Sequence, residues 1–246
     1  MLQILWLFLI SFSGAFLQTN IGFGLPVIAM LFLPMFLPFS TSVALYQIVG
    51  SAGILYIVLH YRRYIAWRIM LPLLVVALIT GAGVTLISME MEKRILLIIL
   101  GAALILISIF SVWFSDRISV TPTPQNGALL GIVAGIGNGL FGISGPPVAI
   151  YLLAGIDEKR AYLATLQAFF LICNLTTISI RTGGGALDLT HTPLIVSGWL
   201  GIGAGTYLGL KLFERLPKEL LKKLVYGFVG VSGVWIIAQE LLRGGV

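Results

Sequence analysis

The chain has 246 residues, of which 59% are hydrophobic and only 10% are charged, and its mean hydropathy is +1.06. A soluble domain carries about 25% charged residues, so this composition excludes a water-soluble protein. Apolar stretches longer than about 18 residues favour membrane helices over a barrel. The net charge of +6 comes from basic residues between apolar stretches, where orientation signals belong, and it does not point to nucleic acid. We therefore expect an all-α protein embedded in a lipid bilayer.

Eight apolar blocks follow one another along the chain, and we predict a polytopic helix bundle built from two four-block repeats. The blocks cover residues 2–39, 41–60, 67–88, 95–114, 126–155, 161–180, 192–212 and 220–242. Residues 1–114 form the first membrane repeat, 115–126 a surface linker containing Pro, Ser and Thr, and 127–246 the second repeat, and both repeats share one transmembrane domain. The apolar start follows no Lys or Arg, so we interpret it as retained rather than as a cleaved signal peptide.

The first and fifth blocks are too long for one crossing. As straight helices they would measure about 57 Å and about 45 Å at 1.5 Å per residue, whereas the hydrocarbon layer is about 30 Å thick. Each block also has Gly and Pro near its middle, in the segments QTNIGFGLP (18–26) and GIGNGLFGISGPP (135–147). We predict that both helices break there and that the chain turns back at membrane depth.

The two breaks belong to an internal repeat with a constant offset of 120 residues. The offset places Gln18 on Asn138, Gly22 on Gly142 and Pro26 on Pro146. Further matched pairs are Ala44 and Ala164, Gln47 and Gln167, Gly81 and Gly201, and Gly83 and Gly203. A membrane chain with breaks at corresponding places in two halves is typical of transporters that bind their substrate between the halves.

The distribution of basic residues favours inverted repeats. If every block crossed once, the loops would place six Lys and Arg on one side and nine on the other. If the first and fifth blocks enter and return on the same side, the count becomes eleven against four, which fits the positive-inside rule better. The halves would then be inverted and both chain ends would lie outside. Simple crossings need fewer assumptions and remain an alternative.

A helix that starts at membrane depth presents unpaired backbone N–H groups and the positive end of its dipole, which together form an anion site. Amide side chains flank both breaks, and a staple between helices is the alternative role for each of them. We predict that a small anion is bound by Gln18, Asn20, Gly22, Gly24, Gln47, Asn138, Gly142, Ser144, Gly145 and Gln167. No Asp or Glu lies deep in any block, which disfavours a cation site. The one cysteine, Cys173, offers no metal cluster, and we expect no metal and no cofactor.

Two other groups of residues receive structural interpretations. Arg62, Arg63 and Arg181 lie at predicted helix ends, where they could attract an anion but fit better as orientation charges at the membrane interface. Several glycines are predicted to allow close contacts between helices. They are Gly81, Gly83, Gly201, Gly203, Gly205 and Gly209.

The duplicated halves and the segment 135–147 resemble the TauE/SafE family of sulfite and organosulfonate exporters over nearly the whole chain. The resemblance implies a plasma-membrane permease of a bacterium or archaeon, with about eight membrane helices and a small sulfur-containing anion as substrate. The first-half segment departs from the glycine-richer pattern of the family, since it reads Gly22-Phe23-Gly24-Leu25.

We therefore expect a secondary transporter, and not an enzyme, that exports an anion such as sulfite or an organosulfonate, with the oligomeric state left open. An anion channel would use the same residues, and saturable, counterflow-competent flux would distinguish a carrier from it. An intramembrane serine protease is the enzyme alternative, with Ser144 as nucleophile and His60 or His191 as base. Gly24 at the position that matches Ser144 argues against it, because the break is present there without a hydroxyl.

Overall fold

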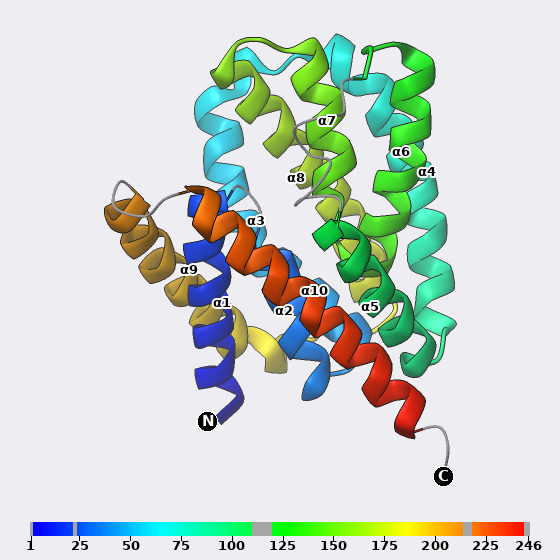
Figure 1. Ribbon diagram of the computed structural model, residues 1–246, viewed down its shortest axis with the longest axis vertical. Helices are drawn as coiled ribbons and strands as arrows, with labels where there is room; N and C mark the ends of the chain where they lie inside the picture. The colour runs from blue at the N-terminus through cyan, green and yellow to red at the C-terminus, as the bar shows by residue number, and fades with distance from the viewer. Residues whose placement is uncertain (1, 22–23, 110–119, 214–217, 244–246) are drawn as a thin grey trace.

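The computed structural model describes residues 2–21, 24–109, 120–213 and 218–243, and within these ranges the protein is helical and contains no strand (Figure 1). Only the backbone is described for 19–21 and for several residues of the last two helices. The α-helices are α1 (Leu2–Ile21), α2 (Leu25–Phe32), α3 (Phe39–Tyr61), α4 (Trp67–Glu90), α5 (Lys93–Ile109), α6 (Pro124–Phe141), α7 (Gly145–Gly155), α8 (Lys159–Gly183), α9 (Thr192–Phe213) and α10 (Lys218–Arg243). Short 3-10 helices are η1 (Leu33–Met35), η2 (Arg62–Tyr64) and η4 (Leu189–His191).

The helices follow the predicted apolar blocks, and both long blocks are divided in the structure. The first block forms α1 and α2, and the fifth forms α6 and α7. The second helix of each pair is too short to cross a membrane, since eight residues of α2 and eleven of α7 extend about 12 Å and about 17 Å. The predicted linker ends earlier than expected, because α6 already begins at Pro124. Residues 115–119 of that linker lie outside the described residues.

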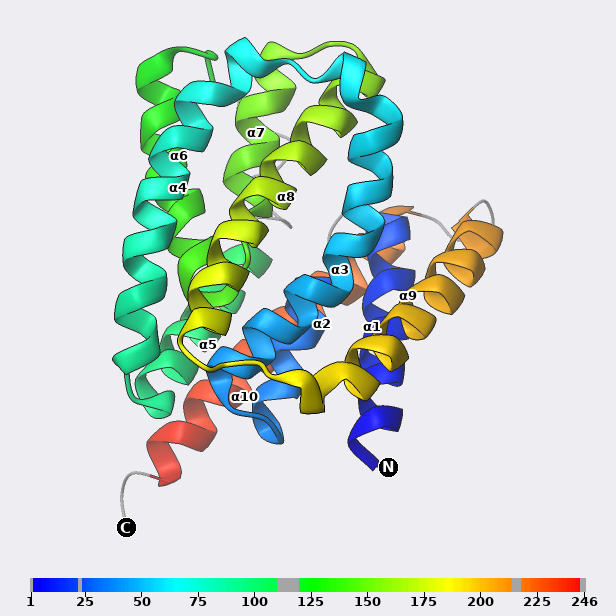
Figure 2. The same cartoon turned by 180° about the vertical axis from the view of Figure 1, so that it is seen from behind.

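Each divided block folds back on itself as a helical hairpin. The ring of Phe36, just beyond η1, lies 6.5 Å from that of Trp6 near the start of α1. In the other hairpin, the Tyr151 hydroxyl near the end of α7 donates to the Thr123 carbonyl at the start of α6, at 3.2 Å. Figures 1 and 2 show that the α1–α2 hairpin returns to the end of the bundle where α1 begins, and that the α6–α7 hairpin returns to the opposite end.

The most extensive helix contacts pair elements of the first half of the chain with elements of the second half. The offset of 120 residues matches α1 with α6, α3 with α8, α4 with α9, and α5 with α10. Helix α1 packs against α9, and its counterpart α6 packs against α4. Helix α3 packs against its own counterpart α8, and α5 packs against α10. Among the described residues, the first helix of each half therefore packs mainly against the fourth helix of the other half.

Glycines bring the exchanged helices into backbone contact. A Cβ atom added at Gly81 would lie 3.4 Å from the Gly135 carbonyl of α6, and one at Gly201 would lie 2.5 Å from the Phe8 carbonyl of α1. Gly205 also faces the backbone of α1. The prediction is wrong for Gly83 and Gly203, which have no neighbouring atom within 4 Å. On a helix these two lie about 200° around from Gly81 and Gly201, so only one glycine of each pair can face the partner helix.

Two hydrophobic cores support the hairpins. One core surrounds α2 and includes Met30 and Leu33, and it also takes in Leu140 and Phe141 from the end of α6. The other surrounds α7 and includes Tyr151 and Leu152 with residues of α4 and α8.

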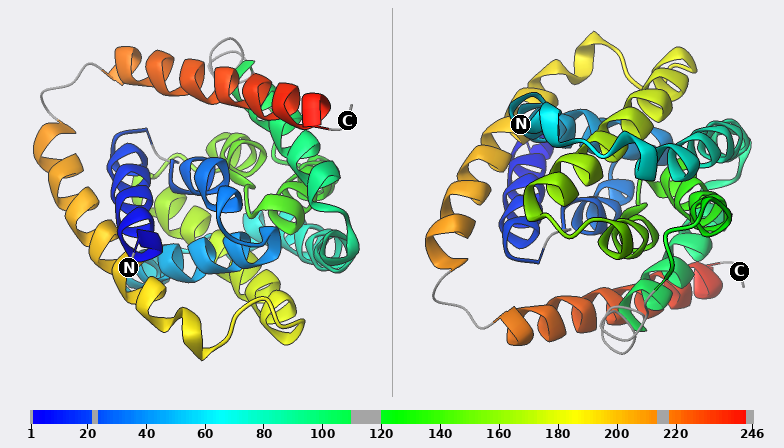
Figure 3. Two further views of the ribbon diagram at one scale, coloured as in Figure 1. Left: turned by 90° about the horizontal axis from the view of Figure 1, so that it is seen from below. Right: turned by 90° about the horizontal axis from the view of Figure 1, so that it is seen from above.

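Viewed along the long axis, α9 and α10 run along the outside of the bundle (Figure 3). Among the described residues three helices, α3, α4 and α8, are both long and apolar enough to span a membrane.

Candidate functional site

The two helix breaks meet at one small cavity of about 60 Å³. The first break contributes Gln18 and the first residues of α2, and the second break contributes Gly142, Ser144 and Gly145. The remaining lining comes from α3 and α8, and the full set is Gln18, Leu25, Pro26, Tyr46, Gln47, Gly50, Ile54, Gly142, Ile143, Ser144, Gly145, Phe170 and Asn174. Since one water requires roughly 10–15 Å³ of this kind of space, the cavity accommodates a small ion and excludes a large organic ligand.

The second break is built around Gly142. Its φ of 68° is left-handed, a conformation that costs other residues a steric penalty but suits glycine. Its N–H donates to the Asn138 carbonyl at 2.7 Å, and the Tyr46 hydroxyl donates to the Phe141 carbonyl at 2.7 Å. A side chain at position 142 would collide with Tyr46 and Gln47. Helix α3 of the first half therefore positions the break of the second half.

The start of α7 presents few backbone donors. Ser144 is the N-cap residue, and its side chain makes no capping hydrogen bond. Pro146 and Pro147 follow Gly145 in the first turn, but proline has no N–H. Of the N–H groups that a helix start leaves unpaired, those of Ser144 and Gly145 remain. A bound anion would therefore need side-chain donors as well.

The first break is closed by a glutamine. The Gln18 side-chain oxygen accepts a hydrogen bond from the Leu25 N–H at 3.4 Å, so this residue pairs the first N–H of α2. Gly24 is the N-cap residue of α2 and is buried. A Cβ at Gly24 would lie 2.8 Å from the Leu17 side chain and 2.9 Å from the Gln18 nitrogen, so only glycine permits this close return of the chain. An anion would have to displace the Gln18 oxygen from the Leu25 N–H.

A line of polar side chains crosses from α3 to α8 beside the cavity. The Gln47 amide group donates to the Asn174 side-chain oxygen at 3.2 Å, and the Gln47 oxygen accepts from the Thr177 hydroxyl at 3.1 Å. Gln47 is completely buried. Uncharged amides that are fixed in this way can donate to an anion without adding negative charge. The arrangement also staples the two halves together, which is the alternative role expected for such amides.

The predicted site residues are only partly brought together. Gln18, Gln47, Gly142, Ser144 and Gly145 line the cavity, and Gly24 lies at the first break. Two others, Asn138 and Gln167, are buried but do not line it. The Asn138 amide donates to the Cys173 carbonyl at 3.4 Å, and its side-chain oxygen has no partner among the described residues. The side-chain oxygen of Gln167 likewise has none there. Gly22 and the Asn20 side chain lie outside the described residues.

Three aromatic or polar lining residues, Tyr46, Phe170 and Asn174, are not among the predicted site residues. Tyr46 and Phe170 line the cavity, yet in an apolar block an aromatic residue is interpreted first as core. Asn174 also lines the cavity. A hydroxyl or an amide in the middle of an apolar block needs a partner in the membrane, and this requirement is the sequence feature that could have identified Tyr46 and Asn174.

The interfacial position expected for Arg181 is wrong. Its side chain is 0% exposed and lies among α3, α4 and α6, where it donates to the Gly139 carbonyl at 2.7 Å and to the Ser40 hydroxyl at 2.9 Å. Position near a helix end suggested an exposed charge. The side chain lies instead between the first turn of α3 and the last turns of α4 and α6, whereas the next two residues of α8 are exposed.

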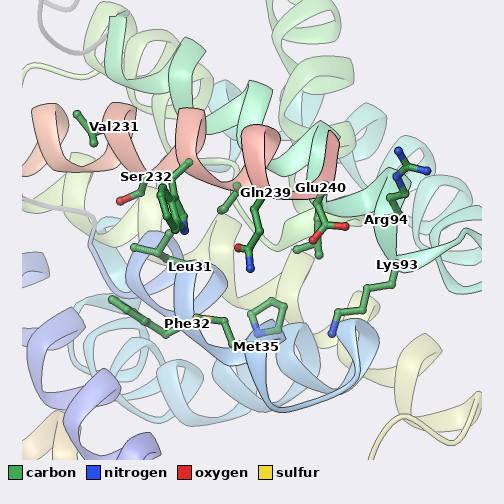
Figure 4. A pocket seen from close by; sticks show the side chains of 13 residues that line it. Leu31, Phe32, Met35, Lys93, Arg94, Val231, Ser232, Gln239 and Glu240 are labelled. Atoms are coloured by element: carbon green, nitrogen blue, oxygen red, sulfur yellow. The ribbon is translucent and has the colours of Figure 1, made fainter. Parts of the chain in front are cut away.

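A larger cavity of about 600 Å³ lies elsewhere, between η1, the start of α5 and α10 (Figure 4). Lys93 and Arg94 line it, but so does the Glu240 carboxylate, and its walls include Phe32 and Trp235. It contains none of the predicted site residues. A third cavity, between α5, α6 and α7, is lined almost entirely by apolar side chains. The larger cavity has uncharged donors of its own, Ser232 and Gln239, but neither cavity is lined by both helix breaks.

No described contact connects Ser144 with a histidine. Ser144 is buried. His60 contacts the rings of Tyr56 and Tyr61, and the His191 ring nitrogen Nδ1 lies 2.8 Å from the Asp188 carboxylate. Within the described residues the structure therefore supplies no base beside Ser144, as a serine nucleophile would need.

Comparisons with known proteins place the chain among membrane transporters. Residues 7–236 match the family model described as "Sulfite exporter TauE/SafE". Over 150 residues the chain is 26% identical to the "Probable membrane transporter protein YdhB" of Bacillus subtilis (strain 168), and the match covers 57% of this chain and 58% of that protein. The chain thus spans less than two thirds of that relative, and no solved structure matches it significantly. The family match and the helical architecture confirm both the resemblance and the all-α membrane bundle, and the chain belongs to the TauE/SafE sulfite exporter family.

Proposed function

We propose that this protein is a secondary transporter that exports a small sulfur-containing oxyanion, such as sulfite or an organosulfonate, and binds it between the two helix breaks. The observation that carries this proposal is the cavity that both breaks line, with Gln47 and Asn174 beside it. Its donors are backbone N–H groups and amides, and none of its lining residues is acidic. Such a site suits an anion, and its size suits a small one.

The exchange of helices between halves suggests how access alternates. Because each half packs its first helix against the fourth helix of the other, inverted repeats would place the site on their shared axis. Rocking of one half against the other would then open the cavity to either side in turn. Export of an anion from a cell that is negative inside is driven by about 2.3 kcal/mol per charge for each 100 mV.

The proposal is tested by removing the two matched amides. Gln47→Leu, alone or combined with Gln167→Leu, is expected to lower saturable sulfite flux at least tenfold in reconstituted vesicles. The fold should survive, because interhelical hydrogen bonds in membranes contribute about 0.6 kcal/mol on average. Gln125→Leu makes the same change at an exposed position of α6 and should leave flux unchanged.

Each outcome of this experiment has a separate meaning. Unchanged flux in the double variant would remove the amides from the site. Wild-type vesicles without saturable flux of any sulfur oxyanion would contradict the function itself, and flux without counterflow would indicate a channel. A thermal-shift series with sulfite, sulfate, thiosulfate, sulfonates and carboxylates identifies the substrate, because a ligand present at 100 times its Kd stabilises the folded state by about 2.7 kcal/mol.

A further inference from the structure

Arg181 is a fully buried positive charge next to the second helix break. Its guanidinium donates to the Gly139 and Leu140 carbonyls at 2.7 and 3.3 Å, and to the Ser88 and Ser40 hydroxyls at 3.1 and 2.9 Å. These partners come from three helices other than α8. Gly139 and Leu140 lie in the last turn of α6, which ends one residue before the cavity-lining Gly142.

None of these partners carries a full negative charge. They are hydroxyls and carbonyls, and among the described residues no Asp or Glu bonds to Arg181, while its Nε has no partner. The end of α6 supplies only about half an elementary charge through its dipole. A buried ion normally requires a partner of opposite charge, because removing it from water is costly. The structure therefore holds an incompletely compensated positive charge.

Capping of the broken helix does not fully explain an arginine here. The repeat places Tyr61 at the position that matches Arg181, and Tyr61 is half-buried at the end of α3. The sequence thus builds the first break without an arginine at this position. Hydroxyl donors can also satisfy carbonyls at a break, as Tyr46 does for Phe141. The charge of Arg181 therefore needs another reason.

We infer that Arg181 provides the fixed positive charge of the anion site and so acts as its specificity-determining residue. This inference rests on the proposed function. The neutral donors of the cavity orient an anion, and the guanidinium behind the last turn of α6 favours a negative solute over a neutral one. In a low-dielectric interior a charge acts over a longer range than in water, so Arg181 need not touch the anion. Affinity should rise with the charge of the ligand.

Charge-changing variants test this role in the purified full-length protein. Arg181→Gln is expected to weaken sulfite binding at least tenfold, and to weaken a doubly charged oxyanion more than a singly charged sulfonate. Arg181→Lys retains the charge and should bind within about threefold of wild type. Arg62→Gln removes an exposed arginine and should have no effect.

A second pair of variants keeps the guanidinium of Arg181 and changes only whether a neighbouring carboxylate neutralises its positive charge. Ser88→Asp places a carboxylate beside Arg181 and should reproduce the affinity loss of Arg181→Gln. Asparagine has nearly the same shape as aspartate but carries no charge. Ser88→Asn should therefore bind sulfite at least tenfold more tightly than Ser88→Asp, which is the factor expected for Arg181→Gln. This pair remains informative if Arg181→Gln does not fold, as size-exclusion chromatography would show.

The inference is overturned by two results. One is a folded Arg181→Gln variant that binds sulfite with unchanged affinity. The other is an equal affinity in Ser88→Asp and Ser88→Asn, which would mean that Arg181 acts only through its hydrogen bonds. If the wild-type protein binds none of the oxyanions, the proposed function itself is contradicted. This result can be distinguished from the two results above, because both of them require that the wild-type protein binds sulfite.

Discussion

Replacing Gly142 with alanine should abolish transport and strongly destabilise the protein. The left-handed backbone at this position alone costs an alanine about 1–2 kcal/mol, with φ at 68°. The new methyl group would also collide with Tyr46 and Gln47, and overpacking of this kind adds about 1–3 kcal/mol. Both side chains would have to leave their hydrogen bonds to Phe141 and Asn174. Flux in vesicles and the thermal unfolding midpoint in detergent measure the two effects.

Gly203→Ala is the matched control for this change. Gly203 lies in α9, and no atom would meet a Cβ there within 4 Å. The same substitution should therefore leave both flux and the unfolding midpoint close to wild type. If Gly142→Ala transported normally, the second break could not have the geometry described here, and the cavity between the breaks would lose its role.

Gly135→Leu is expected to separate α4 from α6 and to prevent folding of the bundle. Gly131, Gly135 and Gly139 lie at intervals of four residues on the side of α6 that faces α4, a spacing that lets two membrane helices approach closely. A Cβ at Gly135 would already lie 2.8 Å from the Ala77 carbonyl and 3.0 Å from the Gly81 nitrogen. These are backbone atoms, which cannot rotate away as a side chain can. The fraction of monodisperse protein after detergent extraction measures the effect.

Gly83→Leu provides the comparison on the opposite face of α4, away from α6. Gly83 belongs to α4 but is exposed and has no neighbour within 4 Å. A leucine there should extract and fold like wild type. Equal yields of Gly83→Leu and Gly135→Leu would show that α4 and α6 do not pack closely through Gly135. The packing of helices from one half against helices of the other would then also be contradicted.

Local chemistry was enough to predict the membrane class, the order of the helical blocks and the positions where two of them are divided. Apolar length decides whether a helix can cross a bilayer, and Gly22, Gly142 and the prolines near them are visible as single residues that a continuous helix tolerates poorly. The amide Gln47 could also be selected, because a polar group inside an apolar block needs a partner wherever the helix packs.

The tertiary structure alone decided which helix ends are covered and which faces are in contact. Arg181 and Arg62 both stand near the end of a long apolar helix, yet one is buried under three neighbouring helices and the other is exposed. Gly81 and Gly83 differ by two positions, yet only one of them touches α6. Burial at a helix end and the direction of a helix face depend on the rotation and tilt of neighbouring helices. Those angles arise from packing between residues more than forty positions apart, which no local pattern in the chain contains.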